Sequence, residues 1–319
     1  MLTILNVTGP IYLSIFAGFL ATRTGFFTKE DSRVLSKFVL NFALPAMLFN
    51  ALAKRSLEDI LHPGYLLAYA LGSLLVLGLG MAFDQWRTRR GLTPAALVGM
   101  GMSCSNSGYV GFPILLQLLG PAAGVGMALT LLVENLLVIP LCLALADSGE
   151  SKHARWQDIV LASLRRLTRM PMLWAIVIGF VFSLLGLHLP DVLSRTINIF
   201  AVACSALALF VNGSALSGIA FKRLLKEIRW VALGKLVLHP LLVGVSFLLV
   251  GPIEPSLFVS GIVLASMPMM SLYVVLGQRH GQEAFCAAAM LFTTVVSFFT
   301  ISAILWALNH LPGWHPPTY

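Results

Sequence analysis

The sequence predicts an all-α membrane protein of ten transmembrane helices, arranged as two inverted five-helix repeats. Hydrophobic residues make up 58% of the 319 residues and charged residues only 11%, whereas soluble domains have about 25% charged residues. An internal repeat is the second observation, because one set of helix-punctuating residues occurs twice with the same spacing, as Pro10, Gly18, Phe19 and Gly25 and then as Pro171, Gly179, Phe180 and Gly186. About five apolar runs belong to each copy, and an odd number of spans inverts the second copy in the membrane.

Ten apolar runs approach the roughly 20 residues that a helix needs to cross a bilayer. We expect these spans at residues 4–22, 32–53, 64–83, 94–119, 122–146, 171–188, 196–220, 230–250, 256–277 and 284–309. They divide the chain into a first five-helix repeat, a cytoplasmic linker, a second inverted repeat and a periplasmic tail, at residues 1–146, 147–170, 171–310 and 311–319.

Basic residues predict the orientation of these spans. Of the 21 Lys and Arg residues, sixteen lie in odd-numbered loops and three in even-numbered loops. Because cytoplasmic loops are enriched in Lys and Arg, we expect the odd loops in the cytoplasm and both termini in the periplasm. The protein is then a multi-pass protein of the cell inner membrane. The net charge of +8 reflects this cytoplasmic face, and no nucleic-acid partner is needed to explain it.

The linker at 147–170 is the longest polar segment. Its apolar residues recur at helical spacing opposite a basic face, at Trp156, Ile159, Val160 and Leu164. This pattern is typical of an interfacial helix that lies on the anionic headgroups of the lipid bilayer. A docking site for a partner protein is the alternative.

Glycine, proline and polar residues interrupt the fourth and ninth spans. The fourth reads Gly-Met-Gly-Met-Ser-Cys-Ser-Asn-Ser-Gly-Tyr-Val-Gly-Phe-Pro over residues 99–113, and the ninth reads Ser-Met-Pro-Met-Met-Ser-Leu-Tyr over residues 266–273. Irregular backbone at membrane depth persists only where it is buried in protein or lines a wet cavity. Two interrupted helices at matching positions of two repeats indicate a transporter's binding site. Close helix packing through Gly and Ser is the alternative.

We expect side chains of the two interruptions, with one residue of the fifth span, to bind substrate: Ser105, Asn106, Ser107, Tyr109, Asn135, Met267, Ser271 and Tyr273. Helix-breaking residues would supply the irregular backbone, at Asn41, Pro45, Gly108, Gly111, Pro113 and Pro268. Asn212-Gly213, in the part of the seventh span related to Asn41, is interpreted first as a packing site.

Three ionisable side chains within the spans are candidates for a coupling or charge role. Glu134 is in the middle of the fifth span, where a charge is costly and is by default a functional hypothesis; a structural pair with a neighbouring hydroxyl is the alternative. Lys235 and His239 lie one turn apart in the eighth span and share a helix face. Lys235 either snorkels to the cytoplasmic surface or adds positive charge to a cavity. His239, which precedes Pro240, either marks a kink or also adds positive charge.

Motifs of enzymes and cofactor sites are absent from the sequence. The chain lacks G-x-S-x-G, H-E-x-x-H, Walker and dinucleotide-binding motifs, so it predicts neither an enzyme nor an intrinsic ATP-driven pump. The cysteines all fall within spans without metal-ligand spacing and are interpreted as packing residues: Cys104, Cys142, Cys204 and Cys286. We expect no cofactor and no metal.

The chain resembles the bacterial branch of the auxin efflux carrier family. The resemblance depends on residues 37–49, 106–113, 235–240 and 267–281. It implies that helices 4 and 9 are broken, cross near the membrane centre and hold the substrate there. It also implies a scaffold domain of helices 1, 2, 6 and 7 and a mobile transport domain of helices 3–5 and 8–10.

The resemblance further implies a substrate class. Bacterial relatives are commonly assigned to small carboxylates such as malonate, and plant relatives export auxin, also a carboxylate. Family members often have a proline at each crossing, and this sequence has Ser105 and Ser271 there. Leu272 also replaces a residue that is often polar. We therefore expect a less symmetric site than in other members.

These observations together favour a secondary transporter that moves a small organic anion by elevator-type alternating access. Half-helices that begin at the crossing would direct N–H groups at a carboxylate, and Glu134 is the candidate site for a coupling proton. A sodium-coupled carrier and a non-transporting membrane sensor with the same fold are the alternatives. The sequence leaves the oligomeric state open between a monomer and a homodimer.

The predicted topology can be tested with single cysteines placed near Tyr319 and near Ser151. The bias of basic residues places these two positions on opposite sides of the membrane. An impermeant thiol reagent added to intact cells should therefore label the first position and reach the second only after the membrane is opened. Labelling of both positions from one side would contradict the ten-span inverted arrangement.

Overall fold

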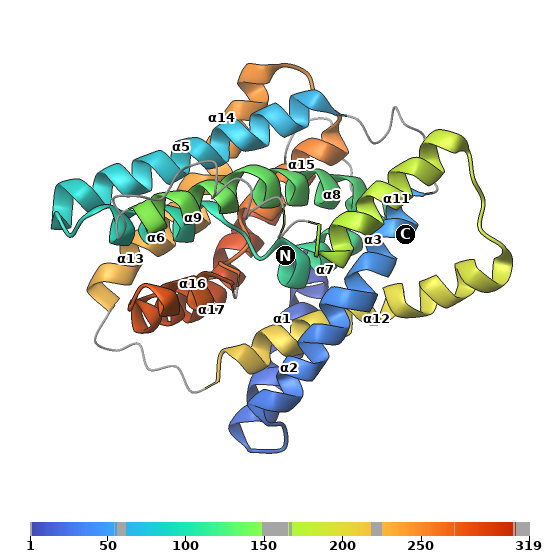
Figure 1. Ribbon diagram of the computed structural model, residues 1–319, viewed down its shortest axis with the longest axis horizontal. Helices are drawn as coiled ribbons and strands as arrows, with labels where there is room; N and C mark the ends of the chain where they lie inside the picture. Colours follow the sequence, from blue (N-terminus) through green and yellow to red (C-terminus); the bar gives the residue numbers. More distant parts are fainter. Residues whose placement is uncertain are drawn as a thin grey trace.

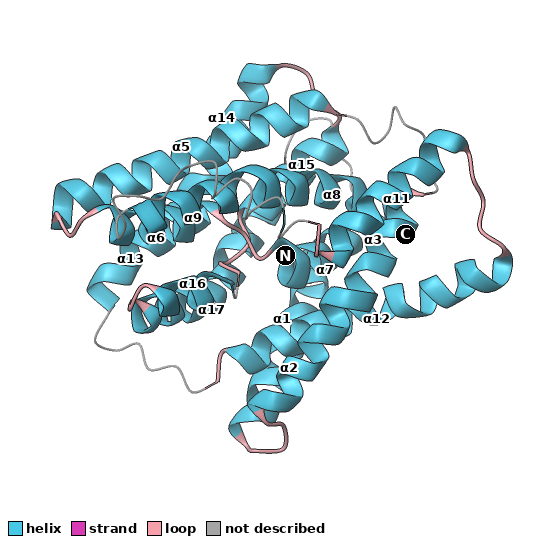
Figure 2. Cartoon of the chain, in the orientation of Figure 1, coloured by secondary structure: helices cyan, strands magenta, loops and turns pink. Residues whose placement is uncertain are grey.

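The computed structural model describes residues 2–53, 55, 62–148, 165, 168–217, 225–270, 272–308 and 310, and in this part of the chain every regular element is helical (Figure 2). The first half contains α1 (Leu2–Arg23), α2 (Lys29–Phe38), η1 (Val39–Ala43), α3 (Leu44–Leu52), α5 (Pro63–Thr88), α6 (Leu92–Ser103), η2 (Ser107–Gly111), α7 (Phe112–Leu119), η3 (Gly120–Ala122), α8 (Ala123–Val133), η4 (Glu134–Val138) and α9 (Ile139–Ser148). The second half contains α11 (Pro171–Leu185), α12 (Asp191–Ala215), α13 (Leu225–Leu233), η5 (Gly234–Leu238), α14 (His239–Val250), α15 (Pro255–Ala265), α16 (Leu272–Arg279) and α17 (Glu283–Leu308).

Within the described residues, six helical segments are long and apolar enough to cross a membrane, so the chain is an integral multi-pass membrane protein. They are Lys29–Leu52, Pro63–Thr88, Leu92–Asp147, Asp191–Ala215, Leu225–Val250 and Glu283–Leu308. Pro171–Leu185 and Pro255–Ala265 are shorter apolar helices. The helix boundaries follow the expected spans within a few residues. Most of the 147–170 linker, the 311–319 tail and Ser271 lie outside the described residues.

Three of these six segments contain wide π turns, four turns in all, and each turn has the same cause. The turns η1, η2, η4 and η5 all end two residues before a proline, at Pro45, Pro113, Pro140 and Pro240. A proline inside a helix lacks an N–H group, and its ring clashes with the carbonyl four residues earlier. The residue before each proline instead donates to the carbonyl five residues earlier, and the widened turn accommodates the ring. Such turns often mark functional sites.

The helices pack into two groups (Figure 1). In the first group α1 packs against α12, α11 packs against α3, and α12 also contacts α2 and α3. In the second group α5 packs against α6 and α14, α6 against α9, α15 against α8, and α16 against α17. The main contacts between the groups join α12 to η2, α3 to α8, and α1 to α7 and α17.

Glycines allow the closest backbone approach, between α1 and α12. A Cβ added at Gly213 would overlap the carbonyl oxygen of Ile15, and one added at Gly18 would overlap that of Phe210. Backbone atoms cannot move aside as a flexible side chain can. The two helices can therefore approach this closely only because glycine, which has no side chain, stands at these positions, as in other membrane helix pairs.

Replacement of Gly213 by alanine should lower the stability of the protein. We expect a loss of about 1–3 kcal/mol from overpacking, measured as a lower midpoint of thermal unfolding in detergent. The matched control is Gly9→Ala in α1, because a Cβ at Gly9 meets nothing within 4 Å. The control should be neutral or slightly stabilising, since alanine favours helix by up to about 1 kcal/mol. Equal midpoints for the two variants would contradict the tight α1–α12 contact.

Candidate functional site

The two interrupted helices meet at one backbone hydrogen bond. In the fourth span α6 ends at Ser103 and η2 begins at Ser107, while in the ninth span α15 ends at Ala265. Between these ends the N–H of Asn106 donates to the carbonyl oxygen of Pro268 at 2.7 Å. The interruptions expected from the sequence are therefore present, and they lie against each other.

The side chain of Asn106 connects this contact to the other helix group. Its Oδ1 accepts the N–H of Tyr109 at 3.3 Å and so caps η2. Its Nδ2 donates to Oδ1 of Asn212 in α12 at 2.8 Å. A second side-chain hydrogen bond between the groups lies nearby, where the hydroxyl of Tyr109 and Oγ of Ser36 in α2 are 2.9 Å apart.

Glu134 is fully buried beside the interruption in the fourth span. Its Oε1 accepts hydrogen bonds from Oγ of Ser107 at 3.1 Å, from the N–H of Ser105 at 3.3 Å and from the hydroxyl of Tyr69 at 3.4 Å. Ser105 and Ser107 lie at the start of the half-helix formed by η2 and α7. The carboxyl group therefore occupies the positive end of a helix, where a negative charge is stabilised.

Lys235 is fully buried at the interruption in the ninth span and does not snorkel to the surface. An ammonium group has three N–H donors, and here each has an acceptor. The acceptors are Oγ of Ser105 at 2.6 Å, Nδ1 of His239 at 2.7 Å and the carbonyl oxygen of Ala265 at 3.0 Å. Ala265 is the last residue of α15, so the cation lies at the negative end of a half-helix.

His239 continues this network into α5. Because its Nδ1 accepts from the ammonium group, its Nε2 carries the hydrogen and donates to Oγ of Ser73 at 3.0 Å. Its ring also contacts Tyr69 edge-on, with centroids 6.0 Å apart. His239 is therefore a neutral acceptor for Lys235 in this arrangement, and not a second cation.

Ser105 joins the buried acid to the buried base. Its N–H donates to Glu134 while its hydroxyl accepts from Lys235. A proline at this position would have neither a donor nor a hydroxyl. Ser105, which stands where family members often have a proline, thus connects Glu134 and Lys235, the two groups that lie at the ends of the half-helices.

Several expected site residues lie away from this network. The amide of Asn135 donates to the carbonyl of Leu131 within its own helix, and that of Asn41 donates to Lys37 in the same way. A Cβ at Gly101 of α6 would approach the hydroxyl of Tyr273, and one at Gly111 would approach Met267. These contacts are typical of packing, and Gly108 also has only ordinary side-chain neighbours.

Two polar partners of the network were missed by the sequence argument. The hydroxyl of Tyr69 donates to Glu134, and Oγ of Ser73 accepts from Nε2 of His239. With Tyr65 they recur every four residues along α5, which places them on one face of that helix. This polar stripe within an apolar span is the signal that could have identified them.

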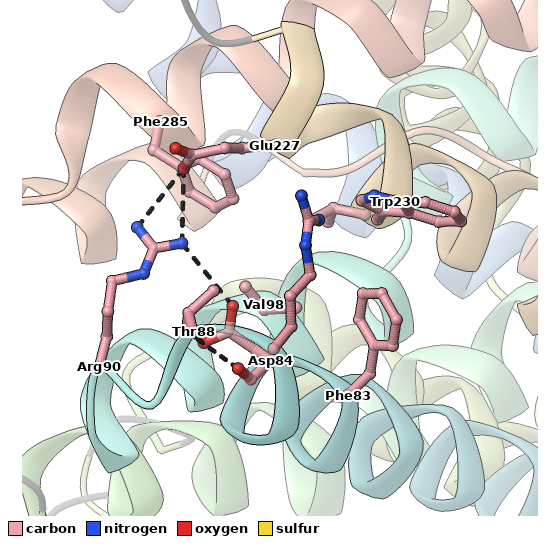
Figure 3. A pocket seen from close by; sticks show the side chains of 10 residues that line it. Phe83, Asp84, Thr88, Arg90, Val98, Glu227, Trp230 and Phe285 are labelled. Atoms are coloured by element: carbon pink, nitrogen blue, oxygen red, sulfur yellow. Dashed lines mark hydrogen bonds and ion pairs between the residues drawn. The ribbon is translucent and has the colours of Figure 1, made fainter.

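A separate cavity of about 340 Å³ lies where α5, α6, α13 and α17 end or begin. Figure 3 shows Arg90 between two acids of its lining, with nitrogen–oxygen distances of 3.4 Å to Glu227 and 3.8 Å to Asp84. The hydroxyl of Thr88 also donates to Asp84 at 3.1 Å. These pairs join the end of α5 to α13. Arg87 also lines this cavity, and its guanidinium lies over the ring of Trp230.

A helical membrane protein with two broken helices in contact, and with a buried acid and base at their ends, has the organisation of a transporter. Comparison with known proteins agrees. Residues 4–305 match the family described as membrane transport protein, and the chain belongs to this family, that of the auxin efflux carriers.

Relatives from bacteria and archaea align along most of the chain. A Rhizobium meliloti (strain 1021) protein named "Putative malonate transporter" is 29% identical over 312 residues, 95% of this chain and 96% of the relative. The "Uncharacterized transporter YfdV" of Escherichia coli (strain K12) is 28% identical over 277 residues, 81% of this chain and 86% of the relative. An "Uncharacterized transporter" of Methanothermobacter thermautotrophicus is 24% identical over 307 residues, 93% of this chain and 95% of the relative.

The connection between Glu134 and Lys235 can be tested by stability measurements on single and double variants. Lys235→Met leaves a buried carboxyl group without its counter-charge, which should cost about 3–5 kcal/mol in the free energy of unfolding. The loss should shrink as the pH is lowered, because protonation removes the unpaired charge. Adding Glu134→Gln to Lys235→Met should recover part of it. Additive losses in the double variant would show that the two groups are independent.

Proposed function

We propose that the protein is a secondary active transporter that moves a small carboxylate across the cell inner membrane, coupled to protons, by elevator-type alternating access. The observation that supports this best is the buried pair of Glu134 and Lys235, held at the ends of two broken half-helices and joined by Ser105. Ionisable groups at this depth are costly and mark transport pathways and proton relays.

The division into two helix groups supports an elevator. The first group contains the helices that the family resemblance assigns to the scaffold, and the second contains those of the transport domain with both interruptions. The packing also has the pattern of an inverted repeat. The contact of α1 with α12 corresponds to that of α11 with α3, and the contact of α5 with α6 corresponds to that of α14 with α15.

Hydrogen-bond donors at the interruptions support an anionic substrate. Asn106 and Asn212 present amide N–H groups between the two helix groups. The relative from Rhizobium meliloti is named "Putative malonate transporter". A carboxylate that leaves water needs such donors to replace its hydration. We therefore expect malonate or a related small carboxylate to bind beside this hydrogen-bonded pair of asparagines.

The surroundings of Glu134 favour a proton over sodium. The groups that face its carboxyl oxygens are the N–H of Ser105 and the hydroxyls of Ser107 and Tyr69, which here act as donors. A bound metal cation instead needs several oxygen lone pairs directed at one point. Protonation of Glu134 would leave the charge of Lys235 uncompensated, and a substrate anion could then balance it.

The function can be tested with purified protein in liposomes that contain no other protein. We expect uptake of labelled malonate that an inwardly directed proton gradient accelerates several-fold. Glu134→Gln keeps the shape of the side chain and removes its titration. This variant should still exchange malonate across the membrane but should no longer respond to the proton gradient.

The alternatives give different results in the same liposomes. A response to sodium alone would exclude proton coupling, and a full pH-gradient response of Glu134→Gln would make Glu134 structural. A sensor with this fold would bind carboxylates without flux. The flux measurement therefore separates a carrier from a receptor, and the two gradients separate the coupling ions.

A further inference from the structure

Asn212 lies on α12, at the contact between the two helix groups, and only 2% of it is exposed. The next residue, Gly213, presses against the carbonyl of Ile15 in α1, so the backbone that positions Asn212 is fixed by the tightest helix contact in the first group. This asparagine is therefore presented to the interruption of the fourth span by a rigid helix.

The orientation of the Asn212 amide follows from its neighbours. The N–H of Tyr109 donates to Oδ1 of Asn106, which leaves Nδ2 of Asn106 as the group that faces α12. Because that nitrogen is a donor, Asn212 must turn its own Oδ1 toward it. Nδ2 of Asn212 is then left over, and none of the described residues accepts a hydrogen bond from it.

A buried amide nitrogen without an acceptor is costly, and such groups are rare in folded proteins. We propose that the missing acceptor is the substrate, so that Asn212 is a carboxylate ligand contributed by the α1–α12 group. This inference rests on the proposed function and adds to it. Recognition is then divided between the groups, because Asn212 in α12 adds its Nδ2 to the donors that the interruption of the fourth span presents.

Asn212 would have a different role if it were only a latch, that is, a hydrogen bond that holds the two groups together without touching the substrate. The hydrogen bond between Ser36 and Tyr109 provides the comparison, since it joins the same two groups nearby. Oγ of Ser36 is not among the buried polar atoms that lack a partner. Loss of this bond removes a latch without removing a ligand, so Ser36→Ala is the matched control.

The experiment measures binding of sodium malonate to purified full-length protein in detergent by calorimetry, at constant ionic strength, with succinate and acetate as further probes. Asn212→Asp keeps an oxygen for Asn106 and replaces the free donor by a negative oxygen. Asn212→Ala removes the donor without adding charge, and it decides the question if the aspartate variant does not fold. Each variant should bind the best probe about 10- to 100-fold more weakly than wild type, as expected for one lost hydrogen bond to a charged group. Ser36→Ala should stay within about threefold of wild type.

The outcomes separate this inference from the function on which it rests. Weaker binding by the Asn212 variants with near-normal binding by Ser36→Ala supports a ligand role. Unchanged binding by folded Asn212→Asp or Asn212→Ala overturns the inference and leaves the carboxylate function standing. An equal loss in Ser36→Ala also overturns it, in favour of a latch. Wild-type protein that neither binds nor transports any of the three acids overturns both.

Discussion

The backbone hydrogen bond from Asn106 to Pro268 is the constraint on which the rest of the site depends. Two helices that stop inside a membrane leave N–H and C=O groups without intrahelical partners, and no water is present to satisfy them. Part of this cost is offset by letting one interruption bond to the other, at 2.7 Å. The two breaks must then stay together, and both lie in the same helix group. In the proposed elevator, a binding site built on them would be carried as a unit with that group.

The remaining helix ends explain why a membrane interior holds an acid and a base. The half-helix that starts at η2 directs its positive end toward Glu134, and α15 directs its negative end toward Lys235. Each side chain stabilises a helix end that the interruption created, and Ser105 connects them. Protonation of Glu134 would weaken one of these two contacts and leave the other intact. The charge of the site and the integrity of the broken helices are thus coupled through the same few atoms.

Much of the fold could be predicted from the lengths of the apolar runs and from the prolines. Bilayer thickness sets the length of each span, and the missing N–H group of a proline interrupts the helix at that residue, so both effects can be read from short stretches of sequence. The interruptions at 104–106 and near Pro268 followed from their Gly, Ser and Pro content. Tyr69, Ser73 and Asn212 were not identified as partners. The stripe of Tyr65, Tyr69 and Ser73 marks a polar face of α5 without indicating what that face contacts, and a single asparagine in a span has no local signature of its contacts. These partners lie on different helices from the interruptions, and only the three-dimensional packing brings them there. Asn212 was interpreted as a packing residue for this reason, although Gly213 beside it is the residue that packs.

Close helix contacts occur both inside the two helix groups and between them. Inside the groups, α1 fits against α12 through Gly18 and Gly213, and α5 fits against α14 through Gly72, so their backbones interlock. Between the groups, α3 meets α8 through two small residues, Ala51 and Gly124. A Cβ added at Gly124 would overlap the Cβ of Ala51, so this contact is as close as those inside the groups. Hydrogen bonds also join the groups, from Asn106 to α12, between Tyr109 and α2, and between Tyr12 of α1 and Ser297 of α17. If Nδ2 of Asn212 binds the substrate, the anion adds one more polar contact between the groups, so its binding and release would change how the two groups are held together.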